Sequence, residues 1–148
     1  MKKVFLPLLA LPLLAAGPAG YVYWSSSHLK GVEKKLDGQK TGIERLENFG
    51  TYSTMVVHRE ATGEAELHRH TVDVMVVENG SGTLVVGGEM VNGKTTAAGE
   101  MRGPSIRGGI QQKLASGDVV NVPANTPHQV QLEPGKQITY FIVKVEAK

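Results

Sequence analysis

Three of the five histidines stand where they could bind one metal ion. His68 and His70 are two residues apart, so in an extended strand both imidazoles project from the same face. His128 directly follows a turn bracketed by Pro123 and Pro127, which would deliver its side chain rigidly to the start of the next strand. Imidazole nitrogen is a good ligand for Fe, Mn, Ni, Zn and Cu, so these residues leave the identity of the metal open. The spacing predicts that His68, His70 and His128 bind one divalent transition metal.

A carboxylate lies close to the same histidine pair. Asp73 follows His70 by three residues and would face away from it along a straight strand, so it reaches the site only if the chain turns at residues 71–72. It is then either a fourth ligand or a partner that orients a histidine ring. The alternative for the histidines is that they line a metal-free binding cavity.

The other polar candidates carry weaker signals. His58 lies alone in a predicted strand, where we expect a buried and hydrogen-bonded structural histidine, and we expect His28 to be exposed. Gln129 and Gln131 do not share the strand face of His128, so both are expected to face outward.

The elements that must position these side chains are strands. After residue 50, runs rich in β-branched and aromatic residues alternate with short segments that contain Gly, Pro, Asn or Asp, and no helical periodicity of useful length is found. A glycine-rich insertion covers residues 89–113, and within it the sequence around Asn92-Gly93 predicts a hairpin over residues 90–95 with a type I′ turn. The pattern predicts an all-β sandwich or barrel. The other predicted strands cover residues 51–60, 74–78, 82–86, 119–122, 128–132 and 138–145, with a turn at 79–82.

Two segments resemble the two sequence motifs of the cupins. The resemblance covers residues 50–145 and keeps the order of the motifs. The first runs Gly63, four residues, His68-Arg69-His70, two residues, Asp73, six residues and Gly80. The second runs Gly117, five residues, Pro123-Ala124-Asn125, two residues, His128, three residues and Leu132.

Three positions depart from the cupin pattern. Asp73 stands for the family's Glu and lies one or two residues closer to the histidine pair, Asn125 stands for a Gly, and Leu132 stands for an Asn. The resemblance implies a small double-stranded β-helix, or jelly-roll barrel, with a metal in its mouth. The ligands it implies are the residues at the motif positions, His68, His70, Asp73 and His128. Cupins include dioxygenases, isomerases and other enzymes, so the family does not identify a reaction.

The first 24 residues predict export from the cytoplasm. Lys2 and Lys3 precede thirteen apolar residues at positions 4–16, which is the arrangement of a secretory signal peptide, and cleavage after Ala19 would release the domain. Alternatively, residues 4–24 carry no charge and as a helix would extend about 31 Å, enough to span a bilayer and tether the domain. Both interpretations place the domain outside the cytoplasm, either periplasmic or secreted.

Composition allows one small domain after this segment. A polar lead-in with a short helix is expected over residues 25–49, and the barrel over residues 50–148.

Apart from Lys2 and Lys3, basic and acidic residues are equal in number, which argues against a nucleic-acid partner, and contact with a membrane is expected only through the N-terminal segment. The absence of Cys excludes disulfides, zinc–thiolate sites and a thiol nucleophile. Strands that are apolar on both faces predict a homodimer.

Two functions agree with these features. One is an exported, metal-dependent enzyme that acts on a small molecule, of dioxygenase or isomerase type. The other is a non-catalytic module of the cell envelope that holds a small molecule or a metal. Additional Tyr, Glu or Arg side chains beside the metal would favour catalysis, whereas a uniformly aliphatic lining would favour binding or oxygen chemistry.

Overall fold

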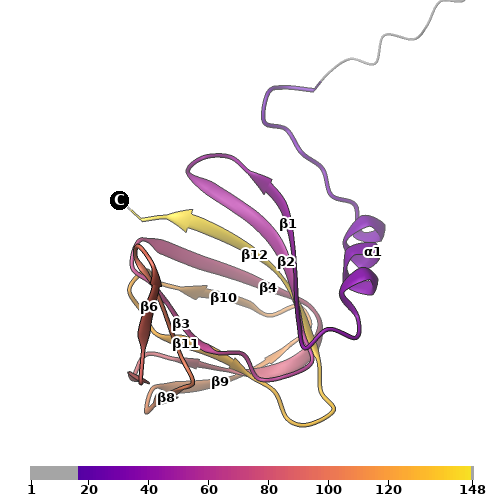
Figure 1. The fold of residues 1–148 in the computed structure, drawn as a ribbon. Helices are drawn as coiled ribbons and strands as arrows, with labels where there is room; N and C mark the ends of the chain where they lie inside the picture. The colour runs from indigo at the N-terminus through magenta and orange to yellow at the C-terminus, as the bar shows by residue number, and fades with distance from the viewer. Residues whose placement is uncertain (1–16, 148) are drawn as a thin grey trace, which may run out of the picture.

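The computed structural model describes residues 17–147, and strands dominate this part of the chain (Figure 1). One helix, α1 (Ser26–Leu36), precedes the strands, so the all-β prediction with a short leading helix is confirmed. The strands are β1 (Thr41–Asn48), β2 (Tyr52–Arg59), β3 (Ala65–His68), β4 (Thr71–Val86), β5 (Glu89–Val91), β6 (Lys94–Ala97), β7 (Glu100–Gly103), β8 (Ser105–Arg107), β9 (Ile110–Ala115), β10 (Val119–Val122), β11 (His128–Gln131) and β12 (Ile138–Glu146).

Most of the predicted export segment, residues 1–16, lies outside the described residues. Within residues 17–147, no helix combines the length and the hydrophobicity needed to cross a lipid bilayer.

Two antiparallel layers share the long strand β4. Its first half pairs with β12 and β10, and β12 continues through β2 to β1. Its second half pairs with β11 and β9, and β11 continues through β3 and β7 to β6. The two layers curl toward each other around a common interior (Figure 1).

The predicted turn at residues 79–82 is a bend inside β4. The strand runs without a break from Thr71 to Val86, and its pairing with β12 shifts register near Thr139. Gly80 has a φ of 80°, and a Cβ at this position would collide with the carbonyl oxygen of Gln137. Glycine therefore lets one strand leave the first layer and enter the second.

Side-chain alternation separates the interior from the outer face. Along β12, Ile138, Tyr140 and Ile142 face inward and are buried, as are Met55 and Val57 of β2. Together with residues of β4, β9, β10 and β11, they form the main hydrophobic core. Because of the same two-residue period, the charged side chains of Arg59 in β2 and Lys144 in β12 also face the interior.

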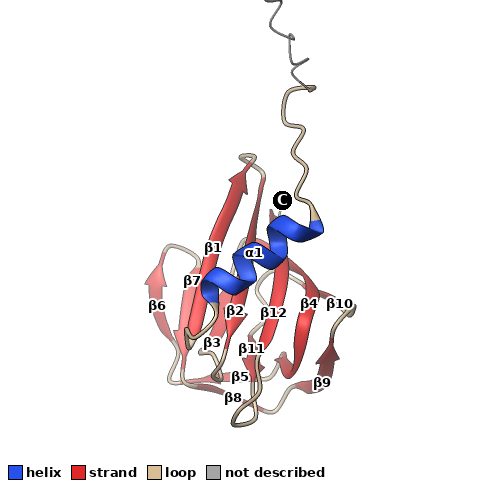
Figure 2. Cartoon of the chain, turned by 90° about the vertical axis from the view of Figure 1, so that its right-hand side faces the viewer, coloured by secondary structure: helices blue, strands red, loops and turns tan. Residues whose placement is uncertain are grey.

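Helix α1 packs on the outside of the first layer (Figure 2). Ser25 caps its first turn, because the Ser25 side chain accepts a hydrogen bond from the backbone N–H of His28 at 3.1 Å. Val32 and Leu36 are buried against the outward-facing Val56 of β2. The helix therefore stabilises the barrel from the side opposite the interior.

Two local predictions are corrected by the strand pairing. The hairpin over residues 90–95 is wrong, because β5 pairs with β8 and β6 pairs with β7. Asn92 has the positive φ that the sequence suggested, but the strands on either side of it separate to different partners. β1 lies within residues 25–49, where a lead-in was expected, and pairs with β2 along its length.

Candidate metal centre

The interior holds a cavity of about 420 Å³. Part of its lining is apolar and includes core residues such as Met75, Val130 and Ile142. The rest of the lining is polar and combines histidines, carboxylates and cationic side chains from several strands. The polar lining comprises Arg45, Ser53, Arg59, Glu64, Glu66, His68, Thr71, Asp73, Glu100, Arg102, His128, Gln129, Tyr140 and Lys144.

Two buried histidines lie next to one another in the lining of this cavity. His68 ends β3 and His128 begins β11, and their ring centroids are 5.3 Å apart. Nδ1 of His68 donates to Oε2 of Glu100 at 2.6 Å, and Nδ1 of His128 donates to the backbone oxygen of Thr126 at 3.1 Å. A hydrogen on each Nδ1 leaves the Nε2 lone pair free to bind a metal. Both imidazoles therefore present a ligand atom to the same space.

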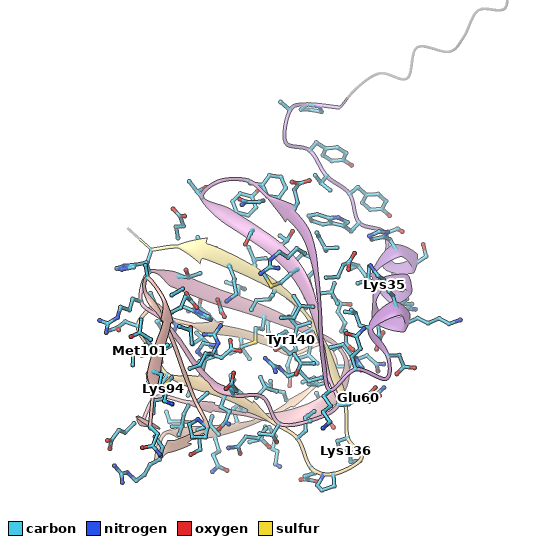
Figure 3. All side chains as sticks on the ribbon, in the orientation of Figure 1. Lys35, Glu60, Lys94, Met101, Lys136 and Tyr140 are labelled. Carbon is cyan, nitrogen blue, oxygen red and sulfur yellow. The ribbon has the colours of Figure 1, made fainter. Side chains whose placement is uncertain are left out.

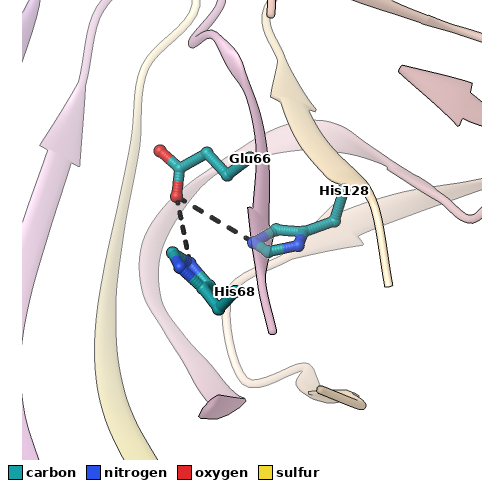
Figure 4. Close-up of side chains that lie close together, drawn as sticks. All are labelled: Glu66, His68 and His128. Carbon is teal, nitrogen blue, oxygen red and sulfur yellow. Dashed lines mark ion pairs between the residues drawn. The ribbon is translucent and has the colours of Figure 1, made fainter. Parts of the chain in front are cut away.

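Two carboxylates complete the group (Figure 4 shows Glu66). Oε2 of Glu66 is 3.5 Å from Nε2 of His68 and 4.0 Å from Nε2 of His128. Oδ2 of Asp73 is 3.4 Å and 3.6 Å from the same two nitrogens. Separations of this size are those of neighbouring ligands around a metal with bonds of about 2.1 Å. The ligand atoms of Glu66, His68 and His128 all lie within 4.8 Å of one another and fit a divalent transition metal, and Asp73 lies beside the two histidines.

Arg59 holds Glu66 in this position. Nη2 of Arg59 donates to Oε1 of Glu66 at 3.2 Å, which leaves Oε2 directed at the histidines. Nε of Arg59 donates to the hydroxyl of Tyr140 at 2.9 Å, and Figure 3 shows Tyr140 in the interior of the barrel. Burial raises the pKa of Glu66, but the contact with His68 and the charges of Arg102 and Arg59 lower it to about 2. Glu66 is therefore ionised at neutral pH.

Asp73 is held by Lys144. Both oxygens of the Asp73 carboxylate accept from Nζ of Lys144 at 2.8 Å. Burial raises the pKa of Asp73, but its close contacts with His128 and His68 lower it. The Lys144 ammonium lowers it further, so that this pKa lies well below the usual range. The carboxylate is thus kept ionised although only 2% of it is exposed.

The protonation of His68 is set by opposing neighbours. Burial and the charge of Lys144 lower its pKa, whereas the neighbouring carboxylates of Asp73 and Glu66 raise it. Nζ of Lys144, however, lies 3.0 Å from Nε2 of His68. An ammonium can donate at this distance only to an unprotonated Nε2, so the geometry assigns the neutral ring with its hydrogen on Nδ1.

The structure does not bring His70 into the group. β3 ends at His68, and the chain bends through Arg69 and His70, so the two-residue period of a strand no longer applies. His70 is exposed, and its ring lies against Gly99 rather than in the cavity. The residue that shares the inward face with His68 is Glu66, two positions before it.

Glu66 and Glu100 were not anticipated from the sequence. A Glu-x-His spacing at residues 66–68 carries the same strand-face signal that was applied to His68 and His70, so Glu66 could have been found. Glu100 could not, because it begins β7 in the glycine-rich insertion and reaches His68 only through the pairing of β7 with β3.

The structure also places His58 and Gln129, for which the sequence predicted a position. His58 is buried and satisfied as expected, since its ring nitrogens lie 2.8 Å from Oγ1 of Thr139 and 3.2 Å from Oε1 of Glu60. Gln129 does not face solvent. It is buried, and its side chain donates to the backbone oxygen of Gly63 at 2.8 Å.

Comparison with protein-family models and with curated protein sequences finds no match. Solved structures do match. The cupin domain of Schizosaccharomyces pombe Cnp3 has a TM-score of 0.54 at 11% identity, over 73% of this chain and 66% of that one. A cupin 2 conserved barrel domain protein from Rhodopseudomonas palustris has a TM-score of 0.51 at 19% identity, over 73% and 62%.

An enzyme is also among the structures that match. The DMSP lyase DddQ from Ruegeria pomeroyi has a TM-score of 0.52 at 13% identity, over 72% of this chain and 47% of that one. The matched region thus spans about half to two thirds of these three proteins. At these identities the likeness establishes architecture only, and the architecture is that implied by the two sequence motifs. The chain has the cupin fold.

Proposed function

We propose that this chain is an extracytoplasmic cupin that binds one divalent transition metal through His68, His128, Glu66 and Asp73 and acts with it on a small molecule. One observation carries the proposal. Both histidines have Nδ1 tied to an acceptor and turn Nε2 toward two ionised carboxylates in a buried space. Such an arrangement favours a cation and orients each ligand before the cation arrives.

Each residue around the group has a role in this proposal. A bound metal would supply Lewis-acid, water-activating or redox chemistry. Glu100 fixes the ring of His68, the Thr126 carbonyl fixes the ring of His128, and Arg59 directs one oxygen of Glu66 inward. The cavity of about 420 Å³ is large enough for a small-molecule ligand.

The lining of the cavity favours a catalytic role over simple binding. Beside the four proposed ligands it contains Tyr140, Glu100, Arg59 and Arg102, so it is not uniformly aliphatic. These groups can donate or accept hydrogen bonds to a bound molecule. The enzyme described as a DMSP lyase, which shares this fold, supports a catalytic proposal without indicating the substrate of this chain.

The test is metal binding by purified protein. Metal-free protein is titrated separately with Mn²⁺, Fe²⁺, Ni²⁺, Zn²⁺ and Cu²⁺ and analysed for bound metal after desalting. We expect one equivalent for the wild type and an affinity loss on the order of a hundredfold for His68→Ala and His128→Ala. Because metal binds the folded state, it should also raise the melting temperature of the wild type.

His70→Ala is the matched control, since it removes an exposed imidazole two residues from His68. It should bind metal as tightly as the wild type. A strong loss in His70→Ala would restore the three-histidine ligand set predicted from the sequence. A wild type that binds none of the five metals would contradict the proposal itself.

A further inference from the structure

Lys144 extends the inward face of β12 into the candidate metal centre. Tyr140, Ile142 and Lys144 follow the two-residue period of the strand, and the first two are buried core residues. The side chain of Lys144 is 22% exposed, so it lies mostly within the barrel while retaining a path to solvent. An ammonium in this place requires polar partners on the interior side.

The partners of Lys144 are two of the proposed metal ligands. Its Nζ lies 2.8 Å from both oxygens of Asp73 and 3.0 Å from Nε2 of His68. The ammonium can direct one hydrogen between the two oxygens of Asp73 and a second at Nε2 of His68. Lys144 therefore neutralises Asp73 and also takes up the nitrogen that the metal would need.

One lone pair cannot serve both cations. Nδ1 of His68 donates to Glu100 at 2.6 Å, so Nε2 holds the only lone pair that His68 directs into the cavity. If that lone pair accepts a hydrogen from Lys144, it is not available to a metal. The hydrogen bond between Lys144 and His68 and the coordination of a metal by His68 exclude one another.

We propose that Lys144 is a tethered cation that competes with the metal for His68 and Asp73, so that metal binds only when the Lys144 ammonium withdraws from Nε2. The inference rests on the proposed metal-binding function. It makes Lys144 a determinant of metal affinity, because the ion has to displace a charge that already compensates Asp73. The partial exposure of the side chain gives the displaced ammonium a route toward solvent.

The first experiment measures metal affinity in Lys144→Met, which keeps an unbranched side chain and removes the charge. Titration of metal-free protein with Zn²⁺ or Mn²⁺ should show affinity higher than wild type on the order of tenfold or more, since the competing charged hydrogen bonds are gone. The metal-induced rise in melting temperature should also be larger in Lys144→Met, because Asp73 has no other ammonium in hydrogen-bond contact among the described residues.

Lys113→Met is the control for the change in net charge. Lys113 is 75% exposed and pairs with Glu133 at 3.4 Å on the surface, so its loss should leave metal affinity unchanged. A second measurement uses the wild type alone, so it does not depend on whether a variant folds. Acetic anhydride labelling read by mass spectrometry should modify Lys144 faster when Zn²⁺ is present, with Lys113 as the internal reference.

The outcomes separate this inference from the proposed function. If the wild type binds metal and Lys144→Met binds it no more tightly, Lys144 is not a competitor while the metal site stands. If Lys144→Met binds metal and the wild type does not, competition by Lys144 is supported while the proposed function of the wild type is contradicted. If neither protein binds any metal, both proposals are overturned.

Discussion

At the residue scale, charged side chains occupy interior positions where strand alternation would ordinarily place apolar ones. Arg59 continues the inward face of β2 after Met55 and Val57, and Asp73 precedes Met75 on the inward face of β4. Each charge has a partner within the described residues: Arg59 contacts Glu66, and Asp73 contacts Lys144. Burial of paired charges contributes little net stability, so a functional reason for these residues is the better explanation.

The ionised carboxylates predict a loss of stability in acid. The pKa of Glu66 is lowered from 4.5 to about 2, so its contribution is complete above pH 4.5 and is lost as the pH falls from 4.5 toward 2. The lowered pKa of Asp73 acts in the same direction. In the presence of a chelator, the free energy of unfolding should therefore fall over this range, by up to about 1.4 kcal/mol per pH unit for each proton taken up.

Chemical denaturation measured at intervals between pH 7 and pH 3 checks this expectation. Glu66→Gln should be less stable than wild type at pH 7, because Arg59 loses its carboxylate partner, but its stability should vary less with pH. The assignment to Glu66 would be refuted by an equally steep acid limb in both proteins.

At the element scale, the outer helix and the interior site depend on opposite faces of the same strand. Val56 of β2 packs against α1, while Val57 and Arg59 point into the barrel. We therefore expect Leu36→Ala, which removes a side chain that is 3% exposed, to destabilise the protein by about 2–3 kcal/mol and to leave metal affinity unchanged.

Urea denaturation and metal titration of the same preparation test this separation. The exposed Lys34→Ala serves as the control from the same helix and should change stability by less than about 0.5 kcal/mol. A loss of metal affinity in folded Leu36→Ala would show that the helix positions the site.

At the scale of the whole molecule, the N-terminal segment predicts the compartment in which any metal is acquired. A reporter that is active only outside the cytoplasm, fused after Lys148, should give signal because Lys2, Lys3 and residues 4–16 have the arrangement of a secretory signal peptide. Deletion of residues 2–16 should abolish that signal. Activity of a cytoplasmic reporter alone would refute export, and a mature chain that begins at Gly20 by mass spectrometry would indicate release rather than tethering.

The sequence by itself determined the fold class and two of the histidines in the group. Alternation of β-branched and polar residues is a local property, and it located β10 and most of β2, β11 and β12. The two cupin-like motifs brought His68 and His128 together across 60 positions of sequence, and the structure places their rings 5.3 Å apart.

The tertiary structure determined which side chains face the interior and which strands pair, because local sequence patterns do not contain this information. The face on which a side chain lies depends on where its strand ends, and β3 ends at His68, so Glu66 rather than His70 points inward. The partners of a strand depend on long-range pairing, which separated the two halves of the expected hairpin and brought Glu100 to His68. Lys144 reaches Asp73 because β12 pairs with β4 in a register that aligns the two residues. Such contacts arise from the packing of the whole barrel, since no segment of the chain encodes them alone.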